Sequence, residues 1–303
     1  MREAGRYDAF VLDGSVGLKG GYLDLLAASA VRPRRSAVVV IADCQWELGP
    51  SRLDRAAMRT GLGLVDGPRV TYCVLSNDEV SIFPRTWRVD PERVMFTPWP
   101  YTLREDELQP QDEGVGIFAG GDSLRDYGPL LEAARDVPVR MTIATRADVA
   151  RGDLPANVEL GPLEHEQYVQ RLRSAPIVVV PLVPTANRSA GQTTYVNALA
   201  MGKLVVVTDC LGVRDYVEHG VTGLIVRPGD APAMGKTLAW AVDPANAAEV
   251  QSIRERARAA AQERLRPDDY VANLLSVAVA ARARLSRSWS SSIGAPASSS
   301  TSR

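Results

Sequence analysis

The sequence predicts an α/β protein with two parallel-sheet halves. Continuously apolar, β-branched runs at 36–44 and 176–182 are typical of strands buried on both faces of a parallel sheet. Segments with helical spacing, such as 51–62 and 193–202, alternate with these runs, as in Rossmann-like βα units. A polar, proline-containing stretch at 99–113 separates two such series, so we expect two domains.

The predicted domains are a short N-terminal one at 1–105, a second one at 106–284 and a disordered, serine-rich tail at 285–303. Ser51 should cap a helix, and Pro84 should interrupt the helix that begins at 77. Further strands are expected at 8–13, 70–76, 93–100, 114–121, 139–146, 158–161 and 203–209. A glycine-containing loop followed by a helix is expected within 15–31, and further helices are expected at 126–134, 164–175, 231–242, 245–265 and 268–284.

Composition sets limits on partners and compartment. The chain has 303 residues, 46% of them hydrophobic, and a formal net charge of -1, which gives no overall basic field for nucleic acid. Its cysteines, Cys44, Cys73 and Cys210, lack metal-type spacing, so we expect buried free thiols in a reducing compartment. No signal peptide or membrane-spanning run is apparent, and we expect a cytoplasmic protein.

One basic cluster could contact a membrane surface. Arg32, Arg34 and Arg35 stand between a predicted helix and a strand. They are interpreted first as a solvated loop, and alternatively as a contact to an acceptor or to a membrane surface, which allows peripheral association.

Two loop–helix junctions have the composition of an anion-binding site. Gly120 and Gly121 follow a strand and let the backbone approach a ligand, while Ser123 and Arg125 offer a hydroxyl and a fixed charge. The second junction consists of Gly191, Gln192, Thr193 and Thr194 at the start of a helix, where free N–H groups and the helix dipole favour an anion. Alternatively, the glycine belongs to an ordinary loop and the threonines cap the helix.

Long ordered blocks in the second half resemble a known family. These blocks are FAGGDSLRDYGPLLEAA and NALAMGKLVVVTDCLGVRDYVEHGVTGLIVRPGD. Residues 114–282 resemble the C-terminal, donor-binding domain of GT-B glycosyltransferases, in particular the large retaining nucleotide-sugar family called group 1. The resemblance implies two Rossmann-like domains facing across a cleft, with an unusually short N-terminal one here.

The chain departs from the family pattern at its charged positions. The family's two glutamates, which contact the donor sugar and the ribose, fall on Ser189 and Asn197. Asn197 can still hold the ribose through its amide, whereas Ser189 cannot replace a carboxylate electrostatically. The family's Arg/Lys pair falls on Gly120 and Arg125, so one of the two cations remains.

The first half resembles the acceptor domain of the same fold from its middle onward. Asp43 ends a strand and is the best candidate for an acceptor-side and catalytic polar group, with loop capping as the alternative. Asp13 and Gly14 are weaker candidates at a neighbouring strand end.

The resemblance implies a hexosyl-transferring enzyme that moves a sugar from a nucleotide diphosphate to a small-molecule or lipid-linked acceptor. Arg125 would neutralise the diphosphate, and neither cofactor nor metal is expected. Retention is favoured, although AGQTTYVN is also similar to an inverting branch. A non-catalytic nucleotide-sugar-binding subunit is the main alternative, and a nucleotide-sugar epimerase of similar architecture is a third.

Overall fold

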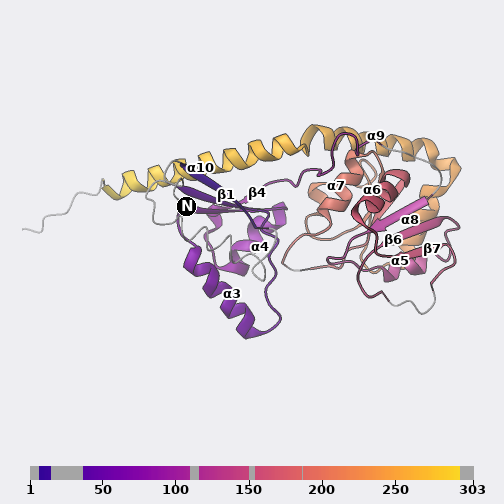
Figure 1. Ribbon diagram of the computed structural model, residues 1–303, viewed down its shortest axis with the longest axis horizontal. Helices are drawn as coiled ribbons and strands as arrows, with labels where there is room; N and C mark the ends of the chain where they lie inside the picture. Colours follow the sequence, from indigo (N-terminus) through magenta and orange to yellow (C-terminus); the bar gives the residue numbers. More distant parts are fainter. Residues whose placement is uncertain (1–6, 15–36, 110–115, 150–153, 186, 294–303) are drawn as a thin grey trace, which may run out of the picture. The chain divides into compact units, whose positions relative to one another are not determined.

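A computed structural model describes residues 7–14, 37–109, 116–149, 154–185 and 187–293 (Figure 1). The chain divides into two compact units. The first unit consists of 1–74, 80–97 and 271–303, and the second consists of 75–79 and 98–270. The loop and helix predicted at 15–31 and the cluster Arg32, Arg34 and Arg35 lie outside the described residues.

The first unit is built on a four-stranded parallel sheet in the order β1-β2-β3-β4. The strands are β1 (Ala9–Asp13), β2 (Val38–Ala42), β3 (Val70–Val74) and β4 (Val94–Phe96). β2 and β3 are buried along their whole length, as their uninterrupted apolar sequences predict. Figure 1 shows α3 (Arg52–Val65) on one face of this sheet and α10 (Pro267–Ile293) on the other.

Local sequence explains where α3 begins. The Ser51 hydroxyl accepts a hydrogen bond from the Asp54 amide, and the Asp54 carboxylate accepts one from the Ser51 amide, which completes a capping box. This confirms the predicted cap. Met58, Leu62 and Val65 then face the core at helical spacing.

The expected interruption at Pro84 is wrong, because α4 (Asn77–Trp87) continues through it. Phe83 and Trp87, on either side of the proline, are buried against Trp46, and Phe83 also packs on Tyr72, with ring centroids 5.4–6.0 Å apart. Aromatic packing of this kind outweighs the loss of one helical hydrogen bond.

The second unit contains a six-stranded parallel sheet in the order β10-β9-β8-β5-β6-β7. The strands are β5 (Gly116–Gly120), β6 (Arg140–Ala144), β7 (Val158–Gly161), β8 (Ile177–Val180), β9 (Leu204–Thr208) and β10 (Leu224–Val226). The helices are α5 (Gly128–Ala133), α6 (His165–Ser174), α7 (Gln192–Ala200), α8 (Ala231–Val242) and α9 (Ala247–Arg264). The strand order reverses between β5 and β8, and open α/β sheets bind ligands at such a switch point.

Each unit is built from several separate segments of the chain, so no single boundary in the sequence divides them. α10 begins in the second unit and passes into the first at Val271, where the sequence assigned it to the donor-binding domain. Arg284 of α10 donates to Thr71 of β3 at 2.9 Å and to the Glu92 carbonyl at 2.8 Å, which fastens the helix to the first unit. The helix also extends to Ile293, beyond Leu285, where an unstructured tail was expected. Helix propagation from the alanine- and arginine-rich segment before it accounts for this extension.

Candidate functional site

The loop after β5 is fixed against the chain that follows β8, at the switch point of the second unit. The Asp126 amide donates to the Pro181 carbonyl at 2.9 Å, and the Val183 amide donates to the Leu124 carbonyl at 3.0 Å. These bonds hold residues 121–125 next to the segment that leads into α7. The two junctions predicted from the sequence are therefore neighbours.

Both glycines of this loop are required by close approaches. A Cβ on Gly120 would lie 2.5 Å from the Tyr168 ring. Gly121 has a φ of +118°, and a Cβ there would lie 2.6 Å from Nη2 of Arg125. Since only glycine fits at either position, the backbone and the two side chains pack into one compact cluster.

The Arg125 guanidinium is held by neutral oxygens. It donates to the Gly120 carbonyl at 3.2 Å, to the Ser123 carbonyl at 2.8 Å and to the Thr194 hydroxyl at 3.3 Å. Burial lowers the pKa of this half-buried arginine. Within the described part of the chain it forms no salt bridge, and the Asp122 carboxylate acts on it only through space.

The N-terminus of α7 faces the same loop. Gly191 is the N-cap residue, with a φ of +88° and no side-chain cap. Thr194 and Tyr195 donate their amides to the Gly191 carbonyl, whereas the amides of Gly191, Gln192 and Thr193 bond to no acceptor among the described residues. Free amides at a helix N-terminus beside an arginine attract an anion.

A second arginine, which the sequence analysis missed, comes from the loop before α7. Arg188 is buried, and its Nη2 donates to the Ser123 hydroxyl at 2.9 Å. Arg125 and Arg188 therefore both bond to Ser123, although they are 63 positions apart. Arg188 thus places a second guanidinium beside Ser123. Its position on a loop between two other elements gave no local signal.

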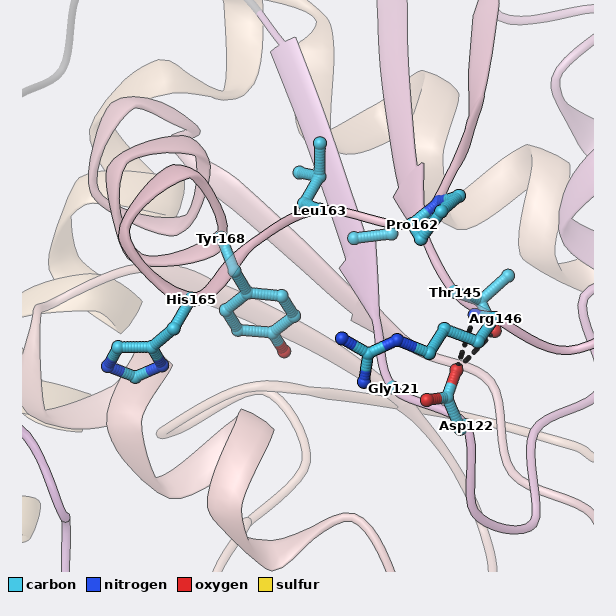
Figure 2. Close-up of a pocket in the computed structure, with 9 residues that line it drawn as sticks. Gly121, Asp122, Thr145, Arg146, Pro162, Leu163, His165 and Tyr168 are labelled. Atoms are coloured by element: carbon cyan, nitrogen blue, oxygen red, sulfur yellow. Dashed lines mark hydrogen bonds between the residues drawn. The ribbon is translucent and has the colours of Figure 1, made fainter.

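A cavity of about 290 Å³ opens beside Gly121 at the carboxyl ends of β5, β6 and β7 (Figure 2). In Figure 2 the Arg146 side chain extends from the end of β6 toward the Tyr168 ring. The other lining residues are Gly121, Asp122, Ala144, Thr145, Pro162, Leu163 and His165. Applying the strand-end rule to β6 and β7 would have pointed to these residues from the sequence.

Asp122 ties the β5 and β6 loops together. Its carboxylate accepts from the Thr145 hydroxyl at 2.8 Å and from the Arg146 amide at 2.7 Å. Burial alone would raise the pKa of Asp122, but these two hydrogen bonds outweigh it and hold the pKa below the usual range. The carboxylate stays ionised at neutral pH and fixes one wall of the cavity.

The two positions where the family has glutamates are buried and hydrogen-bonded to protein. The Asn197 side chain accepts from the Thr102 amide at 2.8 Å and donates to the Thr102 hydroxyl at 3.1 Å. Ser189 donates from its amide and its hydroxyl to Glu79, at 3.0 and 2.8 Å. Gln192 donates to the Ser189 hydroxyl. A carboxylate thus lies beside Ser189, supplied by a segment of the second unit 110 residues away.

We expect Glu79 to make stability depend on pH. Burial raises the pKa of Glu79, although bonds from Ser76 and Ser189 oppose the rise. A carboxyl with a raised pKa takes up a proton in the folded state first, so its contribution to folding improves as pH falls. The unfolding free energy of the wild type, relative to that of Glu79→Gln, should therefore rise as the pH is lowered from neutral to acidic. Urea unfolding of both proteins, with exposed Glu132→Gln as control, measures this, and a pH-independent difference contradicts it.

The acceptor-side candidates meet at one edge of the first unit's sheet. Asp13 ends β1 in register with Ala42, the last residue of β2, and Asp43 follows with a φ of +55°. The Gly14 amide donates to the Ala42 carbonyl at 2.7 Å, and a Cβ on Gly14 would lie 2.5 Å from that oxygen. Asp13, Gly14 and Asp43 are therefore brought together, and their role stays a prediction.

The described residues contain neither a membrane-spanning helix nor a cluster of metal-ligand side chains. No helix of the described residues combines the length and apolarity needed to cross a bilayer. Among the same residues, no three His, Cys, Asp or Glu side chains are grouped closely enough to hold a metal ion. Cys44, Cys73 and Cys210 form no disulfide bond among the described residues, and the first two are buried.

Known proteins with a similar sequence segment or a similar fold are glycosyltransferases and a sugar-phosphate synthase. Residues 124–243 match the family model described as Glycosyl transferases group 1. A glycosyltransferase from Rickettsia africae ESF-5 is similar in structure, with 14% identity and a TM-score of 0.63 over 84% of this chain and 73% of that one. Anabaena Alr3699/HepE in complex with UDP gives 14% identity and a TM-score of 0.66 over 96% and 80%.

A third similar structure is sucrose-phosphate synthase from Thermosynechococcus elongatus, with 16% identity and a TM-score of 0.65 over 95% of this chain and 75% of that one. No curated protein matches the chain. The findings confirm the GT-B fold and the predicted resemblance to the group 1 glycosyltransferases. The matched segment contains Arg125, Arg188 and α7.

Proposed function

We propose that the protein transfers a sugar from a nucleotide diphosphate, with a UDP-sugar as the first donor to test. The observation that carries the proposal is Arg125, a cation bonded to neutral oxygens beside the open N-terminus of α7. A diphosphate would supply the missing negative charge. The Anabaena neighbour was solved with UDP and with UDP-glucose, which supports the choice of uridine.

The cavity next to this cluster suits the nucleoside. Gly121 belongs to both the cavity wall and the arginine cluster, so a ligand can extend from one to the other. The Tyr168 ring and the Pro162–Leu163 backbone would face the base. In this arrangement Ser123, Arg125 and Arg188 hold the diphosphate together with the amides of Gly191 to Thr193. Asn197 would lie toward the ribose and Ser189 toward the sugar.

The proposed chemistry relies on charge stabilisation. As the glycosidic bond breaks, its electron pair stays on the leaving diphosphate, whose negative charge grows. Two arginines and a helix N-terminus act more strongly on that charge than on the bound donor, which lowers the barrier. In a retaining reaction the leaving phosphate oxygen takes the proton of the incoming hydroxyl, so no protein base is required.

We propose retention, a small-molecule or lipid-linked acceptor near Asp43, and no metal or cofactor. Cytoplasmic location likewise stays a prediction.

A thermal-shift panel of UDP, GDP, dTDP and their sugars tests donor binding. A nucleotide at about 100 times its Kd stabilises the folded protein by about 2.7 kcal/mol, or about 5–10 °C for a unit of this size. We expect UDP or a UDP-sugar to give the largest shift. If no diphosphate or sugar nucleotide in the panel shifts the transition, the proposed donor site is refuted.

A non-catalytic, nucleotide-sugar-binding subunit is the second candidate function. The engaged side chains of Ser189 and Asn197, at positions where the family has glutamates, favour it. Donor hydrolysis, followed with the best binder of the panel, separates the two functions. Turnover supports the transferase, and binding without hydrolysis or transfer to any acceptor supports the subunit.

A further inference from the structure

A second cavity, of about 490 Å³, lies in the first unit beside α3 and the end of α4. Four arginines line it, and no part of the proposed transfer chemistry uses them. The cavity is lined by Arg52, Arg55, Arg59, Asp66, Trp87 and Arg88, among others. We call this set the arginine pocket.

Helix geometry concentrates the charge. Arg52, Arg55 and Arg59 stand at positions i, i+3 and i+7 of α3 and therefore share one face. Arg88 joins them from the residue that follows α4. Like charges at these spacings repel each other, so the arrangement destabilises the helix when no anion is present.

The surrounding residues leave these charges uncompensated. Arg55 donates to the Gly49 and Pro50 carbonyls and Arg59 to the Thr86 carbonyl, all neutral acceptors. Within the described residues, the side chains of Arg52 and Arg88 make no hydrogen bond, and none of the four arginines forms an ion pair.

The one acid in the wall of the arginine pocket, Asp66, is paired with an arginine outside the pocket lining, Arg93. Asp66 accepts two hydrogen bonds from Arg93, one of them at 2.9 Å, and its pKa is held below the usual range. The pocket is therefore a concave site with four cations and guanidinium N–H groups to spare.

We propose that the arginine pocket binds a phosphate group. Arginine forks match phosphate oxygens, and several cations at one concave site favour a doubly charged or diester phosphate over a single carboxylate. A lipid headgroup and a free phosphate ion offer the same chemistry, and the two arms of the test distinguish these sources.

The test uses the full chain with Arg52→Gln/Arg88→Gln, because neither side chain has a bonding partner to lose. The control is Arg85→Gln/Arg140→Gln, which removes the same charge from exposed positions outside the pocket. Co-sedimentation with vesicles of phosphatidylcholine containing about one third phosphatidylglycerol is compared for both, alongside pure phosphatidylcholine. The pocket variant should lose about 30-fold in partitioning and the control far less.

A second experiment tests whether the arginine pocket binds a soluble phosphate. Inorganic phosphate is titrated while the Nε–Hε NMR signals of the arginines are followed. Selective shifts of pocket signals, absent in Arg52→Gln/Arg88→Gln, support the proposal with a soluble ligand even if vesicles do not bind. The proposal is overturned if the pocket and control variants lose vesicle binding equally and phosphate shifts no pocket signal. It is also overturned if neither vesicles nor phosphate bind.

Discussion

Replacing Arg125 with alanine should reduce kcat/KM for sugar transfer by about 100- to 1,000-fold. The guanidinium bonds to the Gly120 and Ser123 carbonyls and to Thr194, so it is pre-positioned at the loop where the diphosphate is proposed to lie. A charge held in place before the reaction stabilises the transition state without reorganisation. Initial rates with the best donor, together with donor-induced thermal shifts, measure the effect.

Arg140→Ala is the matched control, because Arg140 is exposed and begins β6 at the end of the strand opposite the cavity. Arg125→Lys, which keeps the charge but not the fork, should recover part of the activity. A lower kcat at an unchanged donor shift would assign Arg125 to the transition state, and loss of both would assign it to donor binding as well. Wild-type rates in Arg125→Ala would remove this residue from the chemistry.

The strands were predictable because their sequences are unambiguous. Runs such as Val38–Ala42 and Leu204–Thr208 are apolar at every position, and only a strand covered on both faces buries all of them. The division into units was less predictable, because a helical pattern does not say which sheet a helix covers. α10 shows this: its periodicity predicts a helix, and only the Arg284 bonds to β3 and the Glu92 carbonyl reveal its place.

Residues of the candidate site also differ in how strongly the local sequence marks them. Gly121 and Arg125 follow a strand, and Gly191 precedes a helix, so local sequence marks each of them. Arg188, Tyr168 and Glu79 have no such mark. Tyr168 matters only because Gly120 leaves room for its ring, and Glu79 only because the chain folds it onto Ser189.

The pair Glu79 and Ser189 changes how the departure from the family pattern is interpreted. From the sequence, Ser189 is a position where a carboxylate has been lost. In the structure a carboxylate lies 2.8 Å from its hydroxyl, contributed by another segment. Electrostatics at this end of α7 therefore depend on a residue outside the matched family segment 124–243.

Breaking the Arg93–Asp66 pair should have the largest effect on stability. Both side chains are shielded from solvent, at 7% and 20% exposure, and Arg93 also donates to the carbonyls of Gly67 and Val70. Asp66→Asn leaves the buried guanidinium with only the half-exposed Asp90, 3.6 Å from its Nε, as a counter-charge, which costs about 3 kcal/mol. Urea unfolding followed by tryptophan fluorescence measures it, because Trp46 and Trp87 lie in the core of the same unit.

The sign of the pH dependence is fixed by Asp66. Burial would raise its pKa, but hydrogen bonds from Arg93 and Tyr72 and the charge of Arg93 outweigh burial and lower it below 3.8. A depressed carboxyl pKa stabilises the folded state above the unfolded pKa, and this contribution is lost as pH falls through the folded pKa. The difference between wild type and Asp66→Asn should therefore be constant near neutral pH and shrink in strong acid.

A paired substitution separates the ion pair from simple packing. Asp66→Leu/Arg93→Met replaces both charges with apolar groups, so no charge is left buried and much of the lost stability should return. If the double variant is as unstable as the sum of its single variants, the two residues contribute independently and the pair has no coupling energy. Recovery in the double variant would show instead that the cost of Asp66→Asn lies in the charge it leaves on Arg93.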